Sequence, residues 1–215
     1  YEEFIKLGAD VLTGGDHIWD QSEITSFINE SQYLLRPLNF PKSTPGNGVK
    51  IFTTRGQKKI MVIHLLGQVF IKYQVDCPFD AVKSIIENNV LGKDFDAIFI
   101  DFHAEATSEK MALAKFLDGK VSAVIGTHTH IPTNDCHVMK FGTAYQTDAG
   151  MCGDYDSVIG MDQDIPIKSF VYKRKFGKMK PAQGSGTLCG TIVEINNNGL
   201  AKSIFPIKIG GIIGD

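Results

Sequence analysis

Two histidines separated by one residue, His128 and His130, offer the clearest chemistry in the sequence. They follow the apolar run 121–125, which is typical of a buried strand. Neutral imidazole nitrogens are common ligands of zinc, iron and manganese ions. Because residues two positions apart on an extended chain point to the same side, we expect both rings to contribute to one metal-binding site.

Further side chains that can bind metal ions follow other apolar runs of the strand type. These residues are Asp16, His17, His103 and Asp148. In open α/β sheets, ligands bind beyond the carboxyl ends of the strands, so we expect these residues to meet the histidine pair at one edge of a sheet. An isolated histidine is more often structural, and we assign His64, which lies inside an apolar run, and His137 to that class.

The elements that would position these residues are predicted from hydrophobic periodicity and turn residues. We expect strands over 9–13, 49–54, 59–65, 96–101, 121–125 and 142–147, and helices over 2–8, 22–28, 78–88 and 107–117. A C-terminal hairpin is expected over 188–209, with its turn at 196–199. Residues 35–48 and 153–184 show little periodicity and are interpreted as loops.

The composition favours an ordinary globular protein and limits its partners. The formal net charge of −2 over 215 residues gives no overall attraction to nucleic acid or to anionic membranes. A local group of cations lies between residues 168 and 180, and we interpret this stretch as a solvated loop. The four cysteines form no Cys-x-x-Cys pair, which argues against a zinc ribbon or a disulfide framework and favours a cytoplasmic location.

Several other enzyme classes lack their motifs in this chain. A serine hydrolase of the α/β type would need Gly-x-Ser-x-Gly, and this pattern does not occur. Neither a P-loop motif nor a Gly-x-Gly-x-x-Gly turn follows a predicted strand. An amidohydrolase also uses two histidines separated by one residue, but on the first strand of a barrel, whereas here the pair comes late in the chain.

Five sequence blocks, in order along the chain, carry a family resemblance. They are Gly15-Asp16-His17-Ile18-Trp19-Asp20, Asp101-Phe102-His103-Ala104-Glu105-Ala106-Thr107-Ser108-Glu109-Lys110, Gly126-Thr127-His128-Thr129-His130, Gly142-Thr143-Ala144-Tyr145 with Thr147-Asp148, and Asp156-Ser157-Val158-Ile159-Gly160. Together they closely resemble the YmdB-like branch of the calcineurin-type metallophosphoesterases, and the match extends over nearly the whole chain.

This resemblance implies an α/β fold, a four-layer αββα sandwich with a dinuclear metal centre at the strand ends. It also implies hydrolysis of phosphoester bonds, with 2′,3′-cyclic nucleotides as the characteristic substrate class. By motif, Asp16, His103 and His128 would hold one ion, and His130 would hold the other. His17 would be the general acid that protonates the leaving oxygen. The implied cofactors are two divalent transition-metal ions, Fe, Mn or Zn.

Two features depart from the family pattern. Asp16 stands where the family has Asn, and it adds a negative charge beside an anionic substrate. The family also begins with strands that carry a Gly-Asp ligand and an Asn-Gly-Glu-Asn segment, and neither occurs in residues 1–215. We therefore expect a single metallophosphoesterase domain over 1–215 in which the N-terminal βαβ portion of the family is absent.

The sequence thus predicts a metal-dependent phosphodiesterase, a hydrolase of bacterial type. Its expected partners are small phosphodiester or cyclic nucleotide substrates, including RNA-derived ones, and no membrane. The alternative is a catalytically degenerate metal- or nucleotide-binding regulator of the same fold, which Asp16 favours. The metal, the physiological substrate and homo-oligomerisation are left open by the sequence.

Overall fold

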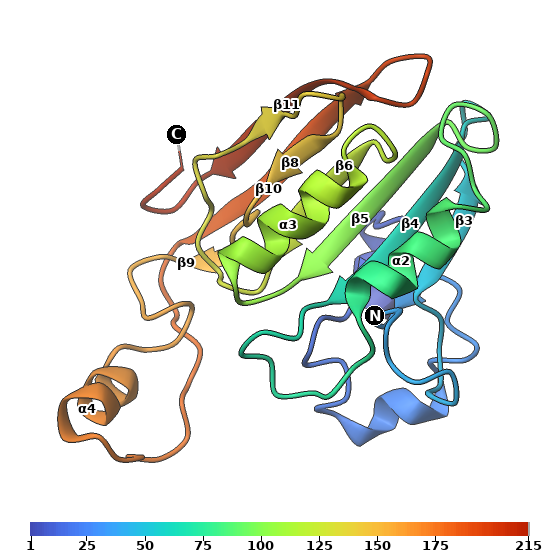
Figure 1. Cartoon of the computed structure of the whole chain (residues 1–215). Helices are drawn as coiled ribbons and strands as arrows, with labels where there is room; N and C mark the ends of the chain where they lie inside the picture. Colours follow the sequence, from blue (N-terminus) through green and yellow to red (C-terminus); the bar gives the residue numbers. More distant parts are fainter. Residues whose placement is uncertain (215) are drawn as a thin grey trace.

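A mixed six-stranded sheet forms the centre of the fold in the computed structural model, which describes residues 1–214 (Figure 1). Its strand order is β3-β4-β5-β6-β8-β7, and the four middle strands run parallel. The strands are β3 (Val49–Thr53), β4 (Lys59–Leu66), β5 (Ala97–His103), β6 (Ala123–Thr127), β7 (His137–Val138) and β8 (Ala144–Gln146). The middle strands are almost continuously apolar because both of their faces are covered.

Helices α2 (Pro78–Ile86) and α3 (Thr107–Leu117) cover one face of this sheet (Figure 1). Pro78 lies in the first turn of α2, where its missing N–H costs no hydrogen bond. Phe102 of β5 and Leu113 of α3 belong to the main hydrophobic core, and both side chains are fully buried. Burial of such side chains, at about 2 kcal/mol each, holds the helices on the sheet.

A second, antiparallel sheet packs against the opposite face. It consists of the hairpin β10 (Gly186–Ile195) and β11 (Ala201–Ile209), extended by the short strand β9 (Gly153–Asp154). Ala201 of β11 packs against Ala123 in a second core cluster between the two sheets. The described residues therefore form helices, sheet and sheet in successive layers, the order expected for an αββα sandwich.

Most elements of the α/β core are confirmed close to their predicted bounds. The hairpin β3–β4 and the C-terminal hairpin β10–β11 both form, and α2 and α3 begin at the predicted residues. Helix α1 (Glu2–Lys6) stops before Gly8, whose φ of 101° is unfavourable for a side chain. Strand β5 is longer than expected and extends to His103 itself.

Two predicted elements near the N-terminus are wrong in extent or type. The strand expected over 9–13 is only β1 (Leu12–Thr13), because its pairing partner β2 (Leu34–Leu35) is equally short. The helix expected over 22–28 is a single 3₁₀ turn, Ser22–Ser26. There, the hydroxyl groups of Thr25 and Ser26 donate to backbone carbonyls three residues earlier, and such local bonds compete with α-helix formation.

The stretch 153–184 is not the plain loop that the sequence suggested. It carries helix α4 (Asp164–Tyr172), which lies away from both sheets (Figure 1). Only Pro166 of this helix is buried. A helix without a buried apolar face leaves no 3.6-residue pattern in the sequence, so periodicity could not reveal it.

All four cysteines are free thiols in the structure. Within residues 1–214, none of the helices combines the length and the apolarity that crossing a bilayer requires.

The parallel strands bring the chemistry-bearing residues to one edge of the central sheet. His103 and Thr127 are paired residues at the carboxyl ends of β5 and β6. Just before this edge, Gly126 lies against the segment that follows β8. A Cβ atom added to Gly126 would be 1.8 Å from the carbonyl oxygen of Thr147. The position therefore has room only for glycine.

Gly126→Ala should destabilise the fold by at least about 2 kcal/mol, because the new methyl group must displace a backbone carbonyl. Gly190→Ala on β10 is the matched control, since a Cβ there meets nothing within 4 Å. Urea denaturation of both variants measures the difference. Equal stabilities of the two variants would contradict the close approach at Gly126.

Candidate metal centre

Three side chains converge at the carboxyl edge of the sheet. His103 Nε2 lies 2.9 Å from Asp16 Oδ1 and 3.0 Å from His128 Nδ1. The third separation, from His128 Nδ1 to Asp16 Oδ1, is 3.8 Å. Ligand atoms around a tetrahedral zinc ion are about 3.3 Å apart, so the spacing of these atoms suits one metal ion.

The outer neighbours of the two imidazoles direct their lone pairs to this point. His103 Nδ1 donates to Thr127 Oγ1 at 2.9 Å, because that hydroxyl gives its own hydrogen to Asp101 Oδ1 at 2.8 Å. His128 Nε2 lies 3.0 Å from the carboxylate of Glu105, which favours a proton on that nitrogen. The lone pairs of the remaining nitrogens and of the Asp16 carboxylate then converge, so either a proton on His103 Nε2, which hydrogen-bonds to Asp16, or a metal cation must lie between them. Metal-binding histidines are commonly held by such outer partners.

The electrostatics of the cluster favour the ligand forms of its side chains. Hydrogen bonding with His103 lowers the pKa of Asp16 to about 2, outweighing burial, which acts in the opposite direction. Burial and the neighbouring His103 lower the pKa of His128, although Asp16 and Glu105 oppose this shift. An ionised carboxylate and a neutral imidazole are the states that coordinate a metal ion.

The backbone that carries the histidine pair is strained and firmly held. His128 and His130 have φ values of 110° and 68°, which non-glycine residues rarely adopt. Between them, Thr129 donates its backbone N–H and its hydroxyl to Asp148 Oδ2, at 2.9 and 2.8 Å. The same oxygen accepts from Lys110 Nζ at 2.9 Å, and both side chains of this ion pair are almost completely buried. The buried pair therefore fixes the conformation of the loop 127–130.

The other two predicted site residues lie beside the cluster rather than in it. His130 lines the same pocket, but its Nδ1 donates to the carbonyl oxygen of Ile159 at 2.9 Å. His17 is largely exposed, with its Nδ1 2.8 Å from Asp20 Oδ2 and its Nε2 3.8 Å from Asp16 Oδ1. The structure thus joins three of the five predicted residues directly and places the other two at the rim.

Two neighbours of the centre escaped sequence reasoning. His64 is buried and structural, as predicted, but the sequence did not show that it connects Asp101 to the segment that carries Asp16. Its Nδ1 lies 3.1 Å from Asp101 Oδ2, and its Nε2 accepts from the backbone N–H of Gly15 at 2.9 Å. An apolar strand gives no signal for such a role. Glu105 lies within the block 101–110 and could have been singled out there.

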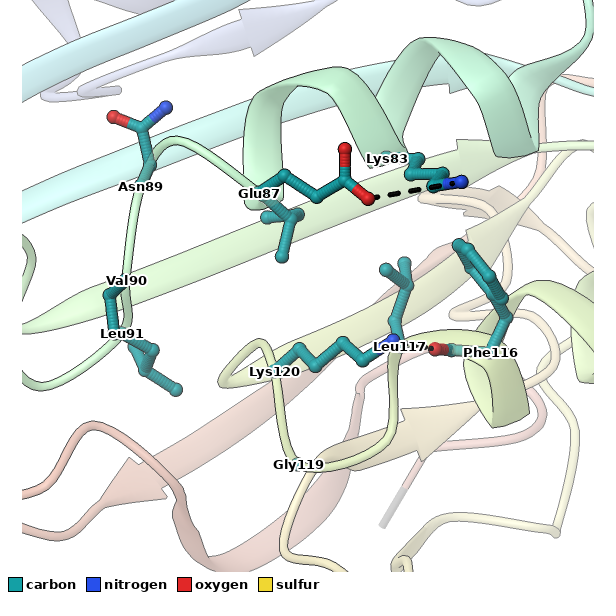
Figure 2. Close-up of a pocket in the computed structure, with 10 residues that line it drawn as sticks. Lys83, Glu87, Asn89, Val90, Leu91, Phe116, Leu117, Gly119 and Lys120 are labelled. Atoms are coloured by element: carbon teal, nitrogen blue, oxygen red, sulfur yellow. Dashed lines mark hydrogen bonds and ion pairs between the residues drawn. The ribbon is translucent and has the colours of Figure 1, made fainter.

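The centre opens into a pocket of about 280 Å³. A separate pocket of about 390 Å³ lies at the ends of α2 and α3 (Figure 2). Its charged groups already have partners, since Lys83 lies 3.8 Å from Glu87 and Lys120 donates to the carbonyl oxygen of Phe116. Among the described residues that line it, none is a histidine, aspartate or cysteine. Among the residues that the structure describes, the candidate group of metal ligands lies at the first pocket.

The fold and this site define a class, the phosphatases with a two-sheet α/β fold. A solved protein from Thermus thermophilus superposes with a TM-score of 0.89 at 35% identity, covering 99% of this chain and 81% of that one. A phosphatase from Mycoplasma pneumoniae gives 0.87 at 32% identity, with 98% and 75% coverage. A 5′-nucleotidase from Candida albicans gives 0.52 at 14% identity, covering 95% of this chain and 36% of that one, and shows the fold alone.

Residues 1–207 match the model of the YmdB-like protein family, and the chain belongs to that family. It is 44% identical over 197 residues to the 2′,3′-cyclic-nucleotide 2′-phosphodiesterase of Bacillus subtilis, covering 92% of this chain and 73% of the relative. A putative phosphatase/phosphodiesterase of Mycoplasma genitalium is 38% identical over 176 residues, covering 79% and 61%.

These comparisons confirm the predicted family, the fold class and the enzyme class, a phosphoesterase. The cluster of Asp16, His103 and His128 has the ligand types and spacing that can hold a metal ion. The identity of the metal, the roles of the individual residues and the single-domain organisation over 1–215 stay predictions.

The buried pair of Asp101 and His64 predicts a pH dependence of stability. Burial would raise the pKa of Asp101, but the electrostatic attraction of His64 and hydrogen bonds from His64, Thr13 and Thr127 outweigh it and lower the pKa to about 2. A carboxylate with a lowered pKa stabilises the folded state above its ordinary pKa of 3.8, and this contribution is lost as the pH falls towards 2.

Asp101→Asn should therefore reduce stability at pH 7 and weaken the loss of stability between pH 4 and pH 2. Urea denaturation of the wild type and the variant at a series of pH values measures both effects. The same pH dependence in the two proteins would show that Asp101 is not held as an ionised carboxylate.

Proposed function

We propose that this protein is a metal-dependent phosphodiesterase that hydrolyses 2′,3′-cyclic nucleotides at the centre formed by Asp16, His103 and His128. The observation that carries the proposal is that Asp16 Oδ1, His103 Nε2 and His128 Nδ1 converge. The other ring nitrogen of each histidine is paired with Thr127 or Glu105, which leaves the converging nitrogens free to bind a metal ion. The name of the Bacillus subtilis relative supports the substrate class.

The centre is proposed to be dinuclear. Asp16, His103 and His128 hold one ion, and His130 contributes to the second. Because His130 Nδ1 donates to the carbonyl oxygen of Ile159, its Nε2 carries the free lone pair. Nitrogen and oxygen ligands suit Fe, Mn or Zn. When bound, such ions neutralise the charge of the phosphate and make water a competent nucleophile near neutral pH.

His17 is proposed as the general acid that protonates the leaving oxygen. Its exposed ring stands at the mouth of the centre, and Asp20 fixes the orientation of the ring through Nδ1. The other nitrogen, Nε2, faces Asp16. A histidine can donate a proton near neutral pH, which is the requirement for an ester oxygen to leave without a negative charge.

Asp16 favours a second candidate function, a regulator that binds a metal ion or nucleotide without turnover. Its ionised carboxylate adds one negative charge where the family pattern has a neutral amide. This charge strengthens attraction for a cation and opposes the approach of a phosphate. The cytoplasmic location stays a prediction for either function.

The full-length protein, supplied with Mn²⁺ or Fe²⁺, should hydrolyse 2′,3′-cyclic AMP and bis-p-nitrophenyl phosphate. His128→Ala should lower kcat/KM at least 100-fold, because it removes one ligand and the positive charge that this ligand holds beside the phosphate. His137→Ala is the matched control, since this histidine is exposed and lies outside the cluster. Metal binding without turnover would establish the regulator instead. Equal activity of His128→Ala and His137→Ala would contradict the proposal that the centre is the catalytic site.

A further inference from the structure

Two chain segments, 160–162 and 180–182, run side by side and form a neck that carries helix α4 away from the sheets (Figure 1). We call residues 155–184 the arm. Its base is held between β9 and β10, and the neck is closed by backbone bonds from Asp162 to Lys180 and from Ala182 to Gly160, at 2.8 and 2.9 Å. The arm is therefore a projection whose base is fixed by backbone hydrogen bonds.

Residues 165–180 of the arm are strongly cationic in an otherwise acidic chain, whereas its residues 155–164 carry Asp156, Asp162 and Asp164. Between residues 165 and 180 there are six of the 22 lysines and arginines and none of the 24 aspartates and glutamates. All six side chains are exposed, and they are Lys168, Lys173, Arg174, Lys175, Lys178 and Lys180. Such a concentration of one sign of charge selects an anionic partner and repels a second copy of the same surface.

Exposed aromatic rings accompany these cations. Phe170 and Tyr172 are 71% and 65% exposed, which is unusual for aromatic side chains of a folded protein. The ring of Tyr172 lies 5.5 Å from that of Phe176, and the guanidinium of Arg174 stands 4.3 Å above the same Phe176 ring. Flat rings beside exposed cations are the features with which proteins bind single-stranded nucleic acid, by stacking on bases and pairing with phosphates.

The base of the arm contacts His130, which lines the same pocket as the cluster of Asp16, His103 and His128. His130 donates to the carbonyl oxygen of Ile159, and the hydroxyl of Tyr155 donates to the carbonyl oxygen of His130 at 3.0 Å. Both partners belong to the first residues of the arm. The base of the arm therefore adjoins the pocket that contains His128 and His130.

We propose that the arm binds single-stranded RNA and that the centre acts on the 2′,3′-cyclic phosphate at the end of such a strand. This proposal rests on the proposed function and specifies its substrate as an oligoribonucleotide. In the reaction, the oxygen of water bonds to phosphorus, one of the two ring P–O bonds breaks, and the released ribose oxygen takes a proton. The product is a terminal phosphomonoester, and no reactant besides water is needed.

Binding is tested first without any reaction. Fluorescence anisotropy measures the Kd of a labelled 12-nucleotide oligouridine with a 3′-hydroxyl end for the full-length protein. Lys173→Glu/Arg174→Glu/Lys175→Glu should raise the Kd at least tenfold and make binding less dependent on salt. Phe170→Ala/Tyr172→Ala should also raise it. Lys6→Glu/Lys42→Glu/Lys208→Glu makes the same change of charge at exposed sites elsewhere and should retain binding.

Turnover then separates this proposal from the proposed function. The arm variants should keep the wild-type kcat/KM for a 2′,3′-cyclic mononucleotide and lose at least tenfold for a 12-mer that ends in a cyclic phosphate. RNA binding without any turnover would contradict the proposed phosphodiesterase activity but would support the arm as an RNA-binding surface. The arm proposal is wrong if the arm variants bind RNA as the control does. It is also wrong if the arm binds only phosphatidylserine vesicles, or if its substitution alters only the oligomeric state in sedimentation.

Discussion

A single buried carboxylate holds the loop on which the candidate centre depends. Asp148 accepts from the backbone and hydroxyl of Thr129 and from Lys110, so one oxygen joins helix α3 to the loop between two strained histidines. Removing one partner of such a buried pair costs about 3–5 kcal/mol, because the other charge stays without compensation. Replacing a whole buried pair by apolar residues is, by contrast, often neutral for stability. The interaction therefore contributes more to the geometry of His128 and His130 than to the net stability of the fold.

Around the interaction of Asp148 with Thr129 and Lys110, the fold brings residues together that are distant in the sequence. Parallel strands β5 and β6 end side by side, so His103 and Thr127 meet although 24 positions separate them. From the N-terminal segment, the backbone N–H of Gly15 is bound by His64, which places Asp16 opposite His103. Each of the three side chains is thus oriented by a partner outside the cluster, and the atoms that could bind a cation face inward. A cation satisfies all three at once.

The sequence was sufficient to predict the sheet, the hairpins and the two packed helices, because apolar periodicity and turn residues determine them. Strand ends indicated that the histidines and Asp16 would meet at one edge, whereas the grouping of Asp16, His103 and His128 followed from the family resemblance. The sequence was insufficient where tertiary contacts decide. Nothing local marks His64 as the partner of Asp101, because an apolar strand surrounds it. Helix α4 packs on nothing that would impose a pattern, and so the cationic stretch appeared to be a solvated loop.

The central claim is that Asp16, His103 and His128 bind a metal ion together. Isothermal titration of the metal-free full-length protein with Mn²⁺ tests it most directly, with His103→Ala and the exposed-site control His137→Ala measured in parallel. We predict that the affinity of the strongest site falls at least tenfold in His103→Ala and is unchanged in the control. Equal affinities for the wild type and His103→Ala would contradict the account.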